Sequence, residues 1–467
     1  MSIAEKSVEF KSLEEKVFSY VCKCGREIIK DILESYDEEI RDSREKKEYR
    51  SKGKRKRTIK TVMGEVEFER NVYETVTEEG EKRYEYLLDK ELGLNRSGFF
   101  SALMTELIAK RCCESSYRNA AQAVSEQTGQ TLSHTAAWNV VQELGQEIDK
   151  QEIHNAKLAK AHKGKGVLES KVLFEEQDGI WLKLQGVARK KYGSSKEMKL
   201  AIAYDGATRT EKGRYNLSNK VACASFEGVN EFVARKEGVI ASTYNVDEVE
   251  TRILNGDGAE WIKRSITDED THFQLDPFHR NKAIYANVKD KRKRAVLFEL
   301  LRNGRVDDAF SCIEGYINCS EDTEEIKGLQ ALEIYFSANR IGLVAIKDRN
   351  IELPENTVKE YRYLGCMESN IFSIIGNRMK GRRACWSLEG GNNLARLLCL
   401  KMTGKLSERL GTMRSVCLPE KYAEEQTVIL SAAKVPLRVG KGYNGFKQGG
   451  AFPATANYEW LRNLGRI

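Results

Sequence analysis

Hydrophobic and polar residues change their spacing several times along the chain, and each change predicts a different kind of element. Over residues 1–50, apolar side chains recur every three or four positions, which is typical of a helix. Residues 58–90 instead alternate apolar and polar side chains around Gly64, and this alternation predicts a small β-hairpin module. Helical spacing returns near Phe99, so the first part of the chain is expected to combine helices with a small sheet.

Two helices joined by a short turn are predicted within residues 91–150. The turn contains Gly129, which suits a helix C-terminus, and Ser133, which suits the N-cap of the next helix. This layout is typical of a helix-turn-helix, whose second helix reads the major groove of DNA, and an ordinary helical hairpin fits the pattern equally well. The residues expected to face outward from the second helix are Thr135, Asn139 and Gln142. Residues 151–165 are charged and predict a linker.

Strand-like segments begin near residue 165 and alternate with helices, which predicts an α/β fold. The expected strands cover 167–174, 180–186, 199–206, 252–257 and 273–276. Helical spacing then covers most of residues 282–361, and two further helices are expected at about 367–380 and 392–405.

The composition argues against a membrane-spanning or disulfide-stabilised protein. Of the 467 residues, 40% are hydrophobic and 31% are charged. There is no apolar run of about 18 residues, and the N-terminus lacks the pattern of a signal peptide. The eleven cysteines include no Cys-x-x-Cys pair, so structural zinc is not expected. An odd number of cysteines without a disulfide framework indicates a reducing compartment. We therefore expect a cytoplasmic protein of roughly three domains.

Positive charge is concentrated in three runs, although the net charge is only +7. Residues 44–60 contain ten lysines and arginines, and shorter basic runs cover 289–294 and 378–383. One such run alone fits a solvated surface equally well, but three favour an anionic polymer, and nucleic acid in particular. The cations expected to contact DNA are Lys54, Arg55, Lys56, Arg57, Arg378, Lys380, Arg382 and Arg383.

Three aspartates stand just past predicted strands and directly before glycine, namely Asp178, Asp205 and Asp257. Each Asp-Gly pair taken alone is more commonly a plain turn. Carboxylates that converge from several strand ends suit Mg²⁺, and two such ions can promote phosphodiester chemistry. Two strand aspartates followed by a helical glutamate are also the arrangement of an RNase H-like nuclease core.

The motifs around these carboxylates resemble those of bacterial insertion-sequence transposases of the ISLre type, which are related to the Mutator-like DDE superfamily. The matching stretches lie at 176–179, 197–199, 256–261, 275–279, 367–370, 377–383 and 385–387. The resemblance spans about residues 58–412. It implies an α/β, RNase H-like catalytic core with a helical insertion, preceded by the β-hairpin module and the helix-turn-helix region.

By this resemblance, Asp178, Asp257 and Glu368 would form the catalytic, metal-binding triad. Glu389 is the alternative third residue, and Glu368 is favoured because it opens a helix that carries Arg378 further along. Asp276 and His279 match an Asp-x-x-His element and are expected beside the site, where orienting a ligand, contacting DNA and catalysis are all open roles. Asp205 is interpreted as a turn residue.

The implied domain order follows the changes in pattern along the chain. It is 1–57 for an N-terminal helix and basic arm, 58–90 for the β-hairpin module, 91–150 for the helix-turn-helix region, 165–281 for the first part of the core, 282–361 for the helical insertion, 362–412 for the last part of the core and 413–467 for a C-terminal extension.

The expected function is that of an insertion-sequence DNA transposase. Such an enzyme would use Mg²⁺, for which Mn²⁺ can substitute, to cleave at the element's ends and join the freed 3′-hydroxyl to target DNA. Its expected partners are the terminal inverted repeats, target DNA and a second copy of the chain in a homodimer, with no membrane and a location at the nucleoid. Two alternatives remain open: a metal-dependent nuclease without strand transfer, and a non-catalytic DNA-binding regulator on the same scaffold.

Overall fold

The computed structural model describes seven stretches of the chain, which fall into two compact units. The described residues are 9–77, 80–94, 100–266, 269–354, 359–361, 365–381 and 383–414. Unit 1 comprises Met1–Ile108, Ala121–Ser133 and Leu410–Ile467, and unit 2 comprises Ala109–Ala120 and His134–Arg409. Nearly all of the predicted C-terminal extension, and Arg382 among the predicted DNA-binding cations, lie outside the described residues.

Unit 1 is built on a long helix and a three-stranded antiparallel sheet of order β1-β2-β3. Its elements are α1 (Phe10–Ser43), β1 (Arg50–Thr61), β2 (Gly64–Val76), β3 (Lys82–Glu85) and α2 (Leu87–Glu91). Alternate residues of β1 and β2 point inward and form a small core with α1 and α2, which includes Leu33, Ile59 and Phe68. The predicted small sheet is therefore present, but it begins at Arg50 rather than at residue 58.

The basic run is a strand and not the predicted exposed arm. Lys54, Arg55, Lys56 and Arg57 all belong to β1. The charge of β1 is balanced mainly by acids of neighbouring elements, through the pairs Lys52–Glu74 (3.0 Å), Lys56–Glu67 (2.8 Å), Lys60–Glu65 (3.2 Å), Arg57–Asp89 (2.5 Å) and Lys54–Glu38. These pairs, three with β2 and one each with α2 and α1, offset the repulsion between like charges, which is why a basic run forms a strand here.

Three helices follow along the chain: α3 (Ala102–Glu114), α4 (Tyr117–Thr128) and α5 (His134–Lys160). Because α5 continues to Lys160, the linker predicted at 151–165 is wrong. The polar second half of α5 is held by charge, since Glu152 pairs with Arg235 of α7 (Val229–Ala241) at 2.8 Å. Gly238 lets α7 approach closely, because a Cβ there would lie 2.5 Å from the backbone nitrogen of Ala156.

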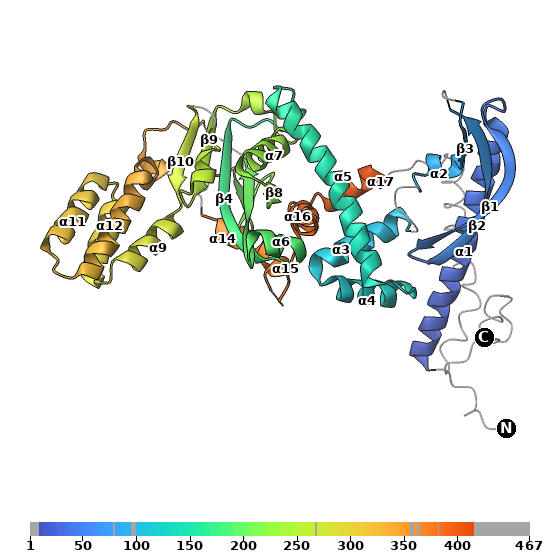
Figure 1. Cartoon of the computed structure of the whole chain (residues 1–467), viewed down its shortest axis with the longest axis horizontal. Helices are drawn as coiled ribbons and strands as arrows, with labels where there is room; N and C mark the ends of the chain where they lie inside the picture. The colour runs from blue at the N-terminus through green and yellow to red at the C-terminus, as the bar shows by residue number, and fades with distance from the viewer. Residues whose placement is uncertain are drawn as a thin grey trace. The chain divides into compact units, whose positions relative to one another are not determined.

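Unit 2 is centred on a five-stranded mixed sheet of order β10-β9-β4-β5-β8 (Figure 1). The strands are β4 (Val172–Lys183), β5 (Ser195–Tyr204), β8 (Val221–Ser225), β9 (Thr251–Gly256) and β10 (Thr271–Leu275). β4, β9 and β10 run parallel, whereas β5 is antiparallel to both β4 and β8. β6 (Ala207–Arg209) and β7 (Tyr215–Leu217) form a separate two-stranded hairpin. The predicted α/β class is confirmed.

The central strand β4 is continuous through Asp178 and Gly179. The two strands predicted at 167–174 and 180–186 are therefore one, and the Asp-Gly turn predicted between them is wrong. β4 lies between β9 and β5 and is buried over its first half, so even its acidic residues are held in the sheet.

The two faces of β4 have different partners. One face, which includes Leu173 and Glu175, packs against α7. The other face carries Glu176, Asp178 and Ile180 in succession and lies under the helix that starts at Met367. This helix runs as α14 (Met367–Ile371), the π-helical turn η4 (Phe372–Gly376) and α15 (Asn377–Met379). It is followed by α16 (Leu388–Met402) and α17 (Leu406–Arg414).

Helices beyond β10 extend the core of the sheet into a helical lobe (Figure 1). They are α9 (Pro277–Asn287), α10 (Lys291–Arg302), α11 (Val306–Cys319), α12 (Thr323–Ala338) and α13 (Arg340–Leu343). The other helical elements described in unit 2 are short: α6 (Gly186–Tyr192), α8 (Glu260–Lys263) and the 3-10 helices η2 (Val246–Glu248) and η3 (Ile346–Asp348). Over the part of the chain that the structure describes, no helix is long and apolar enough to cross a membrane.

Candidate active site

Two aspartates and one histidine meet at the ends of the parallel strands. Asp178 lies on β4, Asp257 directly follows β9, and His279 lies in the first turn of α9 after β10. The parallel register pairs Gln177 with Gly256, which brings the two aspartates to neighbouring positions on adjacent strands. One ligand atom from each of the three side chains lies within 4.8 Å of the others. We call Asp178, Asp257 and His279 the acidic cluster.

The surroundings of Asp178 disfavour the charged form of its carboxyl group. Burial raises the pKa of its carboxyl from 3.8 to about 6. The backbone N–H of Gly179 and the imidazole of His279 oppose this rise in pKa, while the negative charges of Asp257 and Glu368 add to it. A divalent cation would offset both the cost of burying the negative charge and the repulsion between the carboxylates. Two carboxylates with an imidazole are a suitable donor set for such a cation.

His279 is oriented by a second carboxylate. Its Nδ1 lies 2.8 Å from Oδ2 of Asp276, and its Nε2 lies 3.8 Å from Oδ2 of Asp178. The hydrogen bond to Asp276, together with the charge of Asp178, raises the pKa of the imidazole. With Nδ1 donating to Asp276, Nε2 is directed at the acidic cluster, which is the usual way in which proteins orient a metal-binding histidine. The structure thus brings His279 into the cluster and places Asp276 behind it.

The loop that carries Asp257 is braced by the helical lobe. The hydroxyl of Tyr335, on α12, donates a hydrogen bond to the Asp257 carbonyl at 2.7 Å. The carboxylate of Asp257 accepts a hydrogen bond from the backbone N–H of Ala259 at 2.8 Å. Gly258 adopts a φ of 84°, and a Cβ there would lie 2.2 Å from Oδ1 of Asn339. Tyr335 and Asn339 were not predictable as parts of the site, because they lie far from Asp257 in the chain.

The two candidates for the third carboxylate have different surroundings. Glu368 lies in the first turn of α14, is exposed, and is close enough to raise the pKa of Asp178, although it is outside the acidic cluster. Glu389 lies in α16, and its Oε1 accepts a hydrogen bond from Gln146 of α5 at 2.9 Å. The electrostatic coupling to Asp178 supports Glu368.

Glu176 anchors the helix that carries Glu368. Its side chain is fully buried beside Asp178 on the same face of β4. Its carboxylate oxygens accept hydrogen bonds from the backbone N–H groups of Gly365 (3.0 Å), Cys366 (3.1 Å) and Met367 (3.2 Å), from the Cys366 thiol (2.7 Å), from the Tyr204 hydroxyl (2.8 Å) and from Asn255 Nδ2 (3.1 Å). A carboxylate at the start of α14 satisfies N–H groups that the helix itself leaves free. Glu176 therefore fixes the start of α14, the helix that carries Glu368.

A further carboxylate, Glu197 of β5, lies on the face of the sheet opposite to Asp178 but near Asp257. Gly179 leaves room for it, because a Cβ at Gly179 would lie 2.0 Å from Glu197 Oε1. Burial raises the pKa of Glu197, Lys199 opposes this rise, and Asp257 adds to it. Asp205, in contrast, accepts a hydrogen bond from Asn219 Nδ2 at 2.8 Å and pairs with Lys359, so its role is structural.

The residues predicted to read DNA from α5 do not all face outward. Thr135 and Asn139 are exposed, but Gln142 is buried and accepts a hydrogen bond from Asn393 Nδ2 at 2.8 Å. The outward placement of Gln142 is wrong because α16 packs against this side of α5. The sequence pattern could not separate the two faces, since α5 is covered by both α7 and α16.

The predicted DNA-binding cations near residue 380 also differ in their exposure. Lys380 and Arg383 are exposed, whereas Arg378 is half-buried and bound within unit 2. The Nε of Arg378 donates to the Cys112 carbonyl at 2.7 Å, and its guanidinium lies 5.4 Å from the ring centroids of both Tyr117 and Trp386.

Replacing Asp178 by asparagine is expected to stabilise the metal-free protein at pH 8. The pKa of Asp178 is higher in the folded chain (about 6) than its ordinary value of 3.8, so the native state binds more protons between these values and loses stability as the pH rises through them. Asp178→Asn removes this cost of about 1–2 kcal/mol, after allowance for solvent screening. Thermal melts should show a higher melting temperature for Asp178→Asn than for the wild type at pH 8, and a smaller difference at pH 4. The exposed Asp247→Asn is the matched control, and a wild type more stable than Asp178→Asn at pH 8 would contradict the electrostatic account.

Comparison with known proteins places the chain in a family. A model of the family described as "Uncharacterised protein family (UPF0236)" matches residues 3–414. A UPF0236 protein of Caldanaerobacter subterraneus subsp. tengcongensis, whose name joins eleven locus designations, is 25% identical over 411 residues, which cover 86% of this chain and 79% of that protein. The "UPF0236 protein in vanSb 3'region" of Streptococcus gallolyticus is 23% identical over 409 residues, covering 86% of this chain and 85% of its own. Because the family model covers most of the sequence, the chain belongs to the UPF0236 family.

Proposed function

We propose that this protein is a metal-dependent DNA transposase of an insertion sequence. The observation that carries the proposal is the acidic cluster: Asp178 and Asp257 converge from adjacent parallel strands, with His279 beside them and Glu368 coupled to Asp178. A carboxylate such as Asp178, whose pKa is raised by burial and by neighbouring negative charge, is typical of sites that bind cations and act on phosphates.

The topology of the sheet supports an RNase H-like core. A central strand that carries an aspartate, an antiparallel neighbour on one side, and a parallel neighbour that ends in the second aspartate on the other fit such a core. The helix that carries Glu368 covers the same face of β4 as Asp178. The helical lobe of α9–α13 lies between these elements in the sequence, where the family resemblance expects an insertion.

The residues have separate roles in this proposal. Asp178 and Asp257, with Glu368, would hold Mg²⁺ or Mn²⁺, which supplies activation of the attacking oxygen and neutralises charge on the scissile phosphate. Asp276 keeps Nε2 of His279 directed at Asp178, so His279 can serve as an additional ligand or hold a proton at that atom. Glu176 and Tyr335 fix the backbone at α14 and after β9.

The naming of the relatives supports a mobile element in particular. One relative's name joins eleven locus designations of a single genome, and a second relative from the same organism joins four. A sequence that recurs at many loci is the expected result of transposition. An enzyme that pairs two DNA ends would act as a homodimer.

The products formed from DNA that carries both flanks of the protein's own gene distinguish this proposal from its two alternatives. With Mg²⁺ and a labelled target plasmid, a transposase yields labelled joined product. A nuclease without strand transfer yields cut ends only, and a DNA-binding regulator shifts the DNA without cutting it. Cut ends that never join to target would refute the transposase proposal and leave the nuclease.

Neutralising the exposed cations of β1 is expected to weaken DNA binding uniformly across sequences. The logarithm of the affinity falls linearly with the logarithm of the salt concentration, and removing one cation that neutralises a phosphate makes this slope shallower by roughly 0.9. The triple variant Lys54→Gln, Arg55→Gln, Lys56→Gln should therefore lower the slope by about 1–3, with pairing to Glu38 and Glu67 reducing the effect. The matched control replaces three exposed lysines of α1, Lys11, Lys23 and Lys30. Equal slopes for the two triple variants would mean that β1 does not contact DNA.

A further inference from the structure

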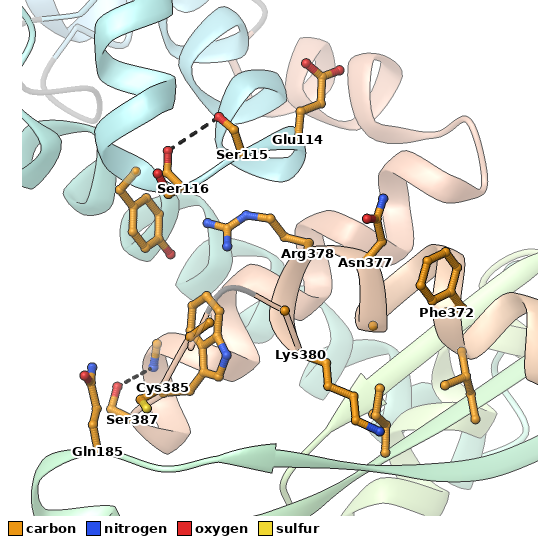
Figure 2. Close-up of a pocket in the computed structure, with 18 of the residues that line it drawn as sticks. Glu114, Ser115, Ser116, Gln185, Phe372, Asn377, Arg378, Lys380, Cys385 and Ser387 are labelled. Carbon is orange, nitrogen blue, oxygen red and sulfur yellow. Dashed lines mark hydrogen bonds between the residues drawn. The ribbon is translucent and has the colours of Figure 1, made fainter.

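A pocket of about 780 Å³ opens within unit 2, next to the C-terminal end of β4. Its walls come from the end of β4, the helix from α14 to α15, the start of α5 and the turn between α3 and α4 (Figure 2). The segment after α15 closes one side, because the backbone N–H of Trp386 donates a hydrogen bond to the Lys183 carbonyl, at the end of β4, at 2.9 Å. This volume lies in the range of pockets that hold small organic molecules.

The pocket adjoins the acidic cluster along a single strand. Ile180 lines the pocket and stands two residues after Asp178, so both side chains lie on the same face of β4, roughly 7 Å apart. Glu368 lines the pocket as well and is coupled to Asp178. A nucleotide whose phosphate lay at the acidic cluster would therefore have its base within reach of the pocket.

The lining combines exposed aromatic rings with two cations and two carboxylates, Glu114 and Glu368. Trp138 is 43% exposed and Phe372 is 65% exposed, although both are large apolar side chains that folding normally buries. Arg378 and Lys380 also line the pocket, and Gln185 and Asn377 add exposed amide groups (Figure 2). Phe372 opens the π-helical turn η4, a rare form that recurs at functional sites.

We propose that this pocket binds an unpaired nucleobase of the DNA strand being cut, stacked on Trp138 and Phe372. The inference rests on the proposed function and deepens it. Stacking on aromatic rings next to Lys and Arg is the general way in which proteins hold single-stranded DNA without reading its sequence. Flat rings beside exposed amides and the ammonium group of Lys380 favour a nucleotide over an apolar peptide, because a nucleotide offers a ring to stack, polar base edges and a phosphate.

Two oligonucleotides that differ only in their bases test the proposal. One is a labelled ten-residue thymidine oligonucleotide, and the other has the same length with abasic sites at its centre, so that both present the same phosphates. Fluorescence anisotropy with the full chain carrying Asp178→Asn, without divalent metal, gives the ratio of the two dissociation constants. We expect the thymidine strand to bind at least about fivefold more tightly, since stacking on aromatic rings contributes that much per base.

Variants then locate the base preference in the pocket. Trp138→Ala with Phe372→Ala should bring the ratio close to one without changing the affinity for the abasic strand, and Trp138→Phe should keep most of it. The matched control is Trp181→Ala, which removes a 60% exposed tryptophan from the opposite face of β4 and should leave the ratio intact. Thermal melts verify that each variant is folded.

The outcomes separate this inference from the proposed function. A ratio of one in the parent protein, or an equal loss in the Trp138–Phe372 and Trp181 variants, overturns the nucleobase pocket even if the wild type cuts and joins DNA. A base preference that depends on Trp138 and Phe372, in a wild type that never cuts, supports the pocket and rejects the enzyme.

Discussion

Replacing either Asp178 or Asp257 by asparagine is expected to lower DNA cutting by more than about a hundredfold while leaving DNA binding nearly unchanged. Each substitution keeps the shape of the side chain but removes a negative charge from the acidic cluster. Even residues that only orient a metal ligand are worth roughly 10- to 100-fold in affinity or activity, so a ligand itself should be worth more. Rates of cutting and dissociation constants, measured on DNA that carries the gene's flanks, give the two quantities separately.

The control for this loss is Asp247→Asn, which removes an exposed carboxylate of the same unit. It should cut at the wild-type rate. His279→Gln should lose less activity than either aspartate variant if the histidine only assists, and as much if it is an obligate ligand. Normal cutting by Asp257→Asn would remove the acidic cluster from the mechanism.

Replacing Glu176 by glutamine is expected to cost about 3 kcal/mol of stability and most of the cutting activity. The carboxylate accepts hydrogen bonds from six groups, whereas an amide turns an NH₂ towards several of those donors. A buried donor left without a partner costs about 1–3 kcal/mol. The start of α14 should then loosen and displace Glu368. Hydrogen exchange of the amides at 365–367 should quicken.

The neighbouring Glu175 is the matched control for Glu176. It is equally buried but faces the other side of β4, where it pairs with Lys236 and with Arg252 at 3.3 Å. Glu175→Gln should destabilise the fold as well, because it leaves the buried Lys236 and Arg252 to share the carboxylate of Glu237. Below the melting temperature of both variants, the Glu175→Gln protein should still cut DNA. Its backbone amides at 365–367 should exchange hydrogen as slowly as in the wild type. Equal cutting by the two variants would show that Glu176 has no role beyond stability.

The features that were predictable from the sequence depend on neighbours in the chain. Apolar runs that end in Asp257 or in Asp276 indicate strands that deliver an acid to one edge of a sheet, and the short spacing from Asp276 to His279 places both near the same helix start. The mixed α/β class follows from the alternation of strand and helix patterns. These signals are local, so one sequence is enough to reveal them.

The features that were not predictable depend on partners far along the chain. Glu176 is separated by about 190 residues from the amides it binds, and nothing in its own stretch distinguishes it from Glu175. Gln142 looked exposed because the burial of α5 on two sides is set by α7 and α16. The basic run became a strand because acids of β2 and α1 balance it, and charge alone gave no sign of that pairing.

The metal dependence of DNA cutting tests the central claim most directly. Wild-type protein and Asp257→Asn are incubated with DNA that carries the gene's flanks, in Mg²⁺, in Mn²⁺ and in excess chelator. The acidic cluster predicts that only the wild type cuts, that it cuts in either metal, and that it stops in chelator while still binding DNA. Undiminished cutting in excess chelator, or equal cutting by wild type and Asp257→Asn in Mg²⁺, would contradict the assignment of Asp178 and Asp257 as the metal-binding centre.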